Sequence, residues 1–171
     1  MKDKYYDIMD EEIKYDENSL IYIENLKLSS YDVLVSGDCN NCVGCFNCWV
    51  KHPFECIFKD KIKNNGRNLY DCDELIIISK CVYGCYSSSV KRILERSISY
   101  VKPFFTLRDG EVHHDVRSDK KIDFKIYFYG DVTESDKEIA YALANANQKN
   151  LNTKRPEVMF FKTKEEIEEI I

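Results

Sequence analysis

The chain has few of the residues that separate domains. It contains three prolines and six glycines among 171 residues, and no segment is rich in proline, glycine or serine. Because flexible linkers are built from such residues, their scarcity predicts a single domain over residues 1–171. A chain of this length buries enough surface for a stable core of its own.

Long apolar runs are also missing. No stretch approaches the roughly 18 apolar residues that a membrane-spanning helix requires, and residues 1–7 lack the apolar centre of a signal peptide. We therefore expect a cytoplasmic protein with no membrane partner. In that reducing compartment, structural disulfides are not expected.

Clusters of basic residues are absent too. The net charge is −5, with 25 lysines and arginines dispersed among 30 acidic residues, so nucleic acid is not an expected partner. The chain contains no Walker loop, His-Glu-x-x-His, Gly-x-Gly-x-x-Gly or Ser-His-Asp order. These absences leave NTPase, zinc protease, classical dinucleotide-fold and hydrolase functions without support.

Cysteine, in contrast, is abundant. Five of the eight cysteines lie within residues 39–56, and four of them follow the spacing Cys42-x2-Cys45-x2-Cys48-x7-Cys56. Thiols this close along the chain can bind one metal centre, exchange disulfides or pack as small apolar groups. Zinc is compatible with the spacing. Cys39, three residues upstream, is either a substitute ligand or an extra thiol.

The C-terminal two-thirds alternates strands with helices. Residues 74–79 form an apolar, β-branched run typical of a buried parallel strand, and a serine-capped amphipathic helix is predicted at 87–96. Further strands are predicted at 124–130 and 157–161. A helix from 133 to about 150 opens with a capping-box pattern, and an amphipathic helix ends the chain. This alternation predicts an open α/β sheet.

The N-terminal third is less regular. Residues 5–9 and 31–36 have strand character, whereas 19–28 is compatible with either a helix or a strand. If that middle segment is helical, the chain has five βα units with a cysteine-rich insertion, residues 39–60, after the second strand. Ligands in such sheets bind beyond the carboxyl ends of the strands.

Two blocks of sequence resemble the flavodoxin-like NAD(P)H-dependent FMN reductases, including the iron-sulfur flavoproteins. The first block is Cys42-Val43-Gly44-Cys45-Phe46-Asn47-Cys48-Trp49 with the trailing Cys56-Ile57-Phe58-Lys59-Asp60. The second is Ser79-Lys80-Cys81-Val82-Tyr83-Gly84-Cys85-Tyr86-Ser87, similar to the family's flavin-wrapping loop. Pro103-Phe104-Phe105 and Gly110-Glu111-Val112-His113-His114 extend the likeness.

The resemblance implies a three-layer flavodoxin-like sandwich with a central parallel sheet of order 2-1-3-4-5 and a compressed N-terminal βα unit. It implies an FMN-dependent oxidoreductase that takes electrons from NAD(P)H and passes them to a quinone, another small acceptor or a protein, and it implies a homodimer. Tyr83 would stack on the flavin ring, with the backbone of Cys81, Val82 and Gly84 at the ring's edge, so the cofactor-binding residues would be Ser79, Lys80, Cys81, Val82, Tyr83 and Gly84. A 4Fe-4S cluster would be held by Cys42, Cys45, Cys48 and Cys56.

Two other functions remain open at this point. The predicted strand 5–9 is followed by Asp10-Glu11-Glu12, where the family has a loop that binds the FMN phosphate; carboxylates repel a phosphate. This favours a flavodoxin-fold protein that has lost FMN and serves as a binding or assembly module. The third function is a flavin-free iron-sulfur electron carrier. His113 and His114, as neighbours, are expected to point to different sides, as a surface or interface pair.

Overall fold

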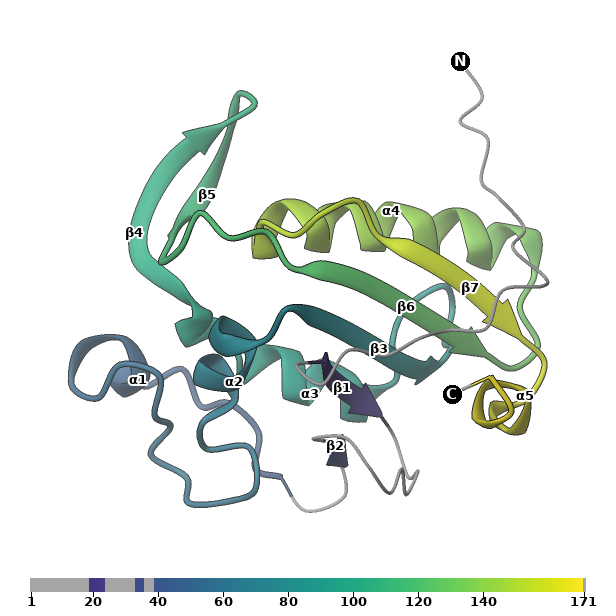
Figure 1. The fold of residues 1–171 in the computed structure, drawn as a ribbon, viewed down its shortest axis with the longest axis horizontal. Helices are drawn as coiled ribbons and strands as arrows, with labels where there is room; N and C mark the ends of the chain where they lie inside the picture. The colour runs from purple at the N-terminus through teal and green to yellow at the C-terminus, as the bar shows by residue number, and fades with distance from the viewer. Residues whose placement is uncertain (1–18, 24–32, 36–38, 171) are drawn as a thin grey trace.

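A five-stranded parallel sheet is the centre of the protein (Figure 1). The computed structural model describes residues 19–23, 33–35 and 39–170. Strand β3 (Glu74–Lys80) is flanked by β1 (Ser19–Ile23) and β6 (Asp123–Tyr129), and the sheet order is β2-β1-β3-β6-β7. Each neighbouring pair is parallel. The predicted α/β architecture with a parallel sheet is thus confirmed.

Most predicted elements of the C-terminal two-thirds are present. Beyond β3 and β6 these are β7 (Glu157–Phe161) and three helices, α3 (Ser88–Glu95), α4 (Glu134–Leu151) and α5 (Lys164–Glu168). The predicted capping box at the start of α4 forms, because Thr133 and Asp136 exchange side-chain-to-backbone hydrogen bonds.

One face of the sheet packs against α3 and α4. The two helices contribute a small set of buried residues, Val90, Ile93, Ala140 and Ala144. The sheet contributes alternate residues, Leu75, Ile77, Phe124, Ile126 and Phe128, as expected when side chains of period two share a face. β3 is buried on both faces, since Ile76 and Ile78 are also almost fully buried.

The N-terminal third contributes two of the five strands of the sheet. Residues 19–23, predicted as helix or strand, form β1, while β2 (Val33–Val35) falls inside the predicted strand 31–36. The predicted strand 5–9 lies outside the described residues. Asp10-Glu11-Glu12, predicted to follow that strand, also lies outside the described residues, so its comparison with a phosphate-binding loop stays a prediction.

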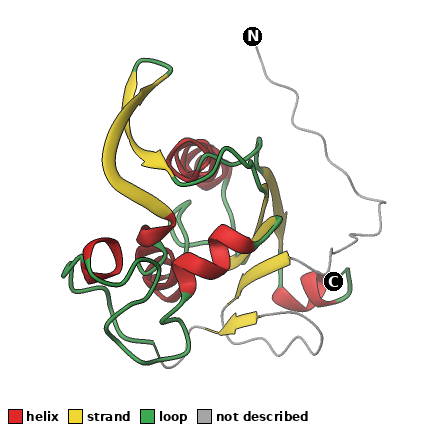
Figure 2. Ribbon diagram, turned by 60° about the vertical axis from the view of Figure 1, so that its left-hand side comes forward, coloured by secondary structure: helices red, strands yellow, loops and turns green. Residues whose placement is uncertain are grey.

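A β-hairpin between α3 and β6 was not predicted as such. After the short 3-10 helix η2 (Ile98–Tyr100), β4 (Val101–Arg108) and β5 (Glu111–Val116) pair antiparallel, with a register shift between Val101 and Phe105. Asp109 and Gly110 form the turn with φ of 52° and 80°. The hairpin projects from the body of the protein as an arm (Figures 1 and 2).

The cysteine-rich residues 39–60 lie between β2 and β3, as predicted. They are largely irregular, with one short helix, α1 (Asn47–Val50), and are followed by α2 (Asn65–Asp71). In the described part of the chain, no helix combines the length and apolar character needed to cross a membrane.

Candidate functional site

The loop after β3 forms a tight turn with an unusual backbone. Val82 and Cys85 exchange two backbone hydrogen bonds, of 2.9 and 3.0 Å. Between them Tyr83 and Gly84 have φ of 53° and 73°. Two successive residues with positive φ are the mark of a type I′ turn, and this conformation is uncommon for tyrosine.

Tyr83 is the side chain that this turn presents to solvent. It is 86% exposed, the highest exposure among the large hydrophobic side chains described. Gly84 packs so closely on α4 that an added Cβ would lie 2.5 Å from the Cβ of Ile139 and 2.7 Å from the backbone oxygen of Asp136. The contact with α4 holds the turn in place. The backbone of Tyr83 is therefore fixed, while its ring stays exposed to solvent.

The base of this loop is held from inside. Ser79 is fully buried, and its hydroxyl accepts a 2.8 Å hydrogen bond from the amide of Ser87, the N-cap of α3. The amide of Cys81 donates to the Tyr129 carbonyl, and that of Val82 to Cys85. The amides of Cys81 and Val82 are therefore engaged within the protein, and the aromatic ring is the main group the loop offers to a ligand.

Burial raises the pKa of the Cys81 thiol, although a hydrogen bond from the Gly84 backbone opposes this effect. A thiol whose pKa is raised is a poor nucleophile at neutral pH. Cys81 therefore contributes packing to the turn, as does the half-buried Cys85.

A hollow adjoins the loop at the carboxyl ends of β6 and β7. Its volume is about 340 Å³. It is lined by Gly130, Asp131, Val132, Thr133, Lys137, Phe160, Phe161 and Lys162. Gly130 has φ of 114° and lies close to the Lys80 side chain, so the loops after β3 and β6 meet at this edge.

The four predicted cysteine ligands line one cavity. Its volume is about 410 Å³, and its walls are Cys42, Val43, Gly44, Cys45, Phe46, Cys48, Cys56, Ile57, Phe58, Glu95 and Ile98. Burial raises the pKa of the Cys48 thiol, and the neighbouring Cys56, Cys42 and Cys45 raise it further. The sulfurs of Cys42, Cys45 and Cys56 are therefore near enough to that of Cys48 to disfavour its ionised form.

The backbone of the cysteine loop curls around this cavity. Gly44 and Phe46 have left-handed conformations, with φ of 64° and 55°. Left-handed residues let a short loop turn tightly around the cavity. Cys39 does not line the cavity; it is buried in the core, which makes it an extra thiol and not a ligand.

No three His, Cys, Asp or Glu side chains of the described residues are arranged around a single metal-ion position. A zinc site places four ligands about 2.0 to 2.3 Å from one ion. A four-iron cluster needs a wider arrangement, because each thiolate binds a different iron. Four thiols that line one cavity are the donor set that such a cluster takes.

Both ends of the cysteine loop are anchored to α3. Arg96, only 4% exposed, forms a bidentate ion pair with Asp60. It also donates a hydrogen bond to the carbonyl of Asn40. Arg92 donates to the carbonyl of Cys39 at 3.2 Å. These arginines fix the start and the end of the segment that carries the thiols.

Four rings connect the cysteine cavity to the hairpin. Phe46 stacks on Trp49 at 5.2 Å between centroids, Trp49 contacts His114 at 5.0 Å, and His114 stacks on Phe105 at 4.6 Å. The Trp49 indole also donates to the carbonyls of Ile98 and Val101. Sequence patterns gave no sign of this contact, because it joins α1 to a hairpin more than fifty residues away.

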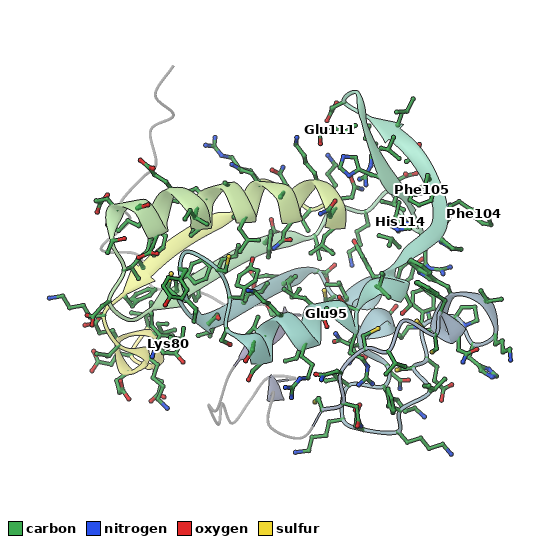
Figure 3. All side chains as sticks on the ribbon, turned by 180° about the vertical axis from the view of Figure 1, so that it is seen from behind. Lys80, Glu95, Phe104, Phe105, Glu111 and His114 are labelled. Atoms are coloured by element: carbon green, nitrogen blue, oxygen red, sulfur yellow. The ribbon has the colours of Figure 1, made fainter. Side chains whose placement is uncertain are left out.

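The structure does not bring the two predicted sites together. The loop at 79–84 precedes α3, whereas the cysteine cavity adjoins Glu95 and Ile98 at the other end of that helix. Eight helical residues span about 12 Å. Figure 3 shows Lys80 at one end of the molecule, the hairpin residues at the other and Glu95 between them.

Comparison with known proteins gives no assignment. No family model, curated protein or solved structure matches the chain.

Proposed function

We propose that the protein is an FMN-dependent oxidoreductase of flavodoxin-like fold, with the flavin at the carboxyl edge of the sheet. The main support is the exposed Tyr83 ring on a fixed positive-φ turn directly after the central strand. The sheet order also supports it: without the hairpin, the strands read 2-1-3-4-5 along the chain. In sheets of this order, FMN binds beside the loops after the first and third strands.

The residues at this edge have distinct tasks in the proposal. Tyr83 offers an aromatic face for the isoalloxazine ring, and Gly84 fixes the turn against α4 so that the ring is positioned in advance. The loop after β6 begins with Gly130, where an added Cβ would meet only the Lys80 side chain, at 3.9 Å, so a ligand can approach the backbone there. FMN, when bound, would supply acceptance of hydride from NAD(P)H and delivery of electrons to a quinone, a small acceptor or a protein.

Oxygen-free purification followed by titration with FMN tests this proposal. We expect a yellow protein that releases FMN on denaturation and oxidises NADH or NADPH in the presence of a quinone. A colourless protein that leaves the FMN spectrum and fluorescence unchanged would overturn it. That result would favour the flavin-free binding or assembly module.

A cysteine-cluster electron carrier is a second proposal, since four thiols line one cavity. Cys42, Cys45, Cys48 and Cys56 would hold the cluster, and the apolar walls formed by Phe46, Ile57 and Phe58 would limit access of water. Because this cavity and the Tyr83 loop lie at opposite ends of α3, iron content and flavin content can be measured as independent properties. A brown, flavin-free protein would support the carrier.

A further inference from the structure

Two arginines contact one aromatic ring beside the base of the hairpin. The guanidinium carbon of Arg67, in α2, is 4.0 Å from the centre of the Phe54 ring, and that of Arg117, directly after β5, is 4.8 Å from it. Tyr70 packs against the same ring at 5.2 Å between centroids. Contact of a guanidinium with an aromatic ring is favourable. It does not compensate two positive charges held at one ring, because like charges repel.

Neither guanidinium forms an ion pair with a residue that the structure describes. Glu55, next to Phe54 in the chain, pairs with Lys63 instead. Nε of Arg117 donates a 2.9 Å hydrogen bond to the Ser99 carbonyl, which leaves both of its Nη groups without a partner among the described residues. Burial lowers the pKa of the Arg117 guanidinium, and the charge of Arg67 lowers it further. An anion between the two groups would relieve this repulsion.

Close packing of α2 on η2 brings these two charges together from distant parts of the chain. Gly66, next to Arg67, touches η2 so closely that an added Cβ would overlap the Ser99 side chain. The carbonyl of the same Ser99 orients Arg117. Only glycine allows this approach of the two elements. The packing of the fold therefore fixes the backbone positions from which both arginines reach the Phe54 ring.

The ring between the arginines is positioned by a strained backbone. Phe54 has φ of 73°, a left-handed conformation that is unusual for a bulky side chain. Its amide donates a 3.0 Å hydrogen bond to the Cys48 carbonyl, which holds the residue in place. Strain of this kind persists where the surrounding structure enforces it, and such residues cluster at binding sites. At Phe54 the strained conformation places an aromatic ring against both guanidinium groups.

The arginines lie at the amino edge of the sheet, because α2 leads into β3 and Arg117 precedes β6. Figure 1 shows α2 and the base of the hairpin at the end of the molecule where β3 begins. The Tyr83 turn follows the other end of β3, and a strand of seven residues spans about 23 Å. An anion bound by the arginines would therefore be separate from the phosphate of an FMN at the carboxyl edge.

We propose that Arg67 and Arg117 bind the phosphate group of a small ligand, at a site distinct from the proposed flavin site. Guanidinium groups donate paired hydrogen bonds to phosphate oxygens and are more weakly hydrated than ammonium groups. A phosphate monoester carries about −1.5 to −2 charges at neutral pH, which matches two arginines. The half-buried rings of Phe54 and Tyr70 offer aromatic surface to an organic group on that phosphate. Inorganic phosphate shares the same chemistry.

Isothermal titration calorimetry at constant ionic strength tests this site with AMP, inorganic phosphate and adenosine. We expect AMP and inorganic phosphate to bind and to displace each other, and adenosine to bind far more weakly. Tighter binding of AMP would assign the site to an organic ester, whereas equal binding of the two would assign it to the phosphate group alone. Failure of both phosphates to bind, or adenosine binding as tightly as AMP, would overturn the proposal.

Variants place the phosphate at the two arginines. Arg67→Gln and Arg117→Gln should each raise the Kd for inorganic phosphate at least about 10-fold, because each removes a charged hydrogen-bond donor. Arg67→Lys keeps the charge without the planar fork and should lie between wild type and Arg67→Gln.

Arg155→Gln removes an exposed arginine before β7, and this matched control should bind as wild type does. Arg67 is itself exposed, so Arg67→Gln gives the answer even if circular dichroism shows that Arg117→Gln is unfolded. Equal affinity of wild type and Arg67→Gln would contradict the assignment. None of these measurements depends on bound flavin or iron, so their failure is distinct from failure of the proposed oxidoreductase.

Discussion

Arg96 and Asp60 form a bidentate ion pair, with Nη1 to Oδ2 at 2.8 Å and Nη2 to Oδ1 at 2.9 Å. The arginine side chain is 1% exposed and the aspartate 10%. Asn40 adds two further hydrogen bonds to the same carboxylate. The pair therefore closes the cysteine loop at both ends and holds it against the last turn of α3.

Asp60→Asn should destabilise the protein strongly, because it leaves the Arg96 charge buried without a counter-ion. Removal of one partner of a buried ion pair costs about 3 to 5 kcal/mol, which urea unfolding would measure. Glu55→Gln is the control: Glu55 pairs with Lys63 on the surface, and its loss should leave the free energy of unfolding nearly unchanged. Equal effects of the two variants would show that the Arg96 contact is dispensable.

Protonation of Asp60 should lower the stability of the protein in acid. Burial acts to raise the pKa of Asp60, but hydrogen bonds from Arg96 and Asn40 outweigh it and hold the pKa well below its ordinary value. A lowered folded-state pKa stabilises the protein above the unfolded pKa, near 3.9, and this contribution is lost as the pH falls below it. Urea midpoints between pH 6 and pH 2 should therefore drop less in Asp60→Asn than in wild type, and parallel curves would contradict this account.

Gly84→Ala should disrupt the turn at Tyr83. The residue has φ of 73°, and an added Cβ would lie 2.5 Å from Ile139, so both backbone strain and overlap oppose the change. We expect a loss above about 2 kcal/mol in thermal or urea unfolding. Gly110→Ala isolates the strain, because Gly110 has φ of 80° and nothing within 4 Å; it should cost about 1 kcal/mol.

Tyr83→Ala should weaken FMN binding without loss of fold, because the side chain is mostly exposed. Loss of one aromatic stack corresponds to about a 3- to 10-fold rise in Kd, measured by flavin fluorescence. Tyr83→Phe keeps the ring and should bind as wild type does. Unchanged affinity in Tyr83→Ala would remove the ring from the flavin site.

Cys45→Ser should lower the iron content of protein purified without oxygen, because Cys45 lines the cavity with three other thiols. Cys85→Ser is the matched control, since Cys85 lies in the turn after β3 and outside that cavity. Iron assay and the absorption spectrum should separate the two variants. Equal iron in both would assign the metal to another place, and none in wild type would leave the thiols as packing.

The elements that sequence predicted well depend on local pattern. β3 is a continuous apolar run, and α4 begins with a capping box whose two partners are three residues apart. The hairpin was harder to predict because Phe104 and Phe105 are adjacent and both exposed, and a register shift breaks the alternation expected of a strand. Pro103 also weakens any strand prediction.

In the candidate site, too, the features that depend on local pattern were predicted and the long-range contacts were not. The four cysteines selected by their spacing line one cavity, and a loop follows β3 where one was predicted, while their binding of iron and of flavin stays a prediction. The ion pair of Arg96 and Asp60 and the contact of Trp49 with His114 join residues 36 and 65 positions apart. Periodicity and motif spacing carry no information on such contacts, because they arise from the packing of distant segments.

Trp49 is the single tryptophan of the chain, and it stands between the cysteine loop and the arm. The tryptophan emission of the protein therefore comes from this junction and not from the sheet. Detachment of the arm would shift the spectrum while circular dichroism, which follows the helices and strands, stays constant. The molecule thus contains an optical probe at the place where its most projecting segment joins the body.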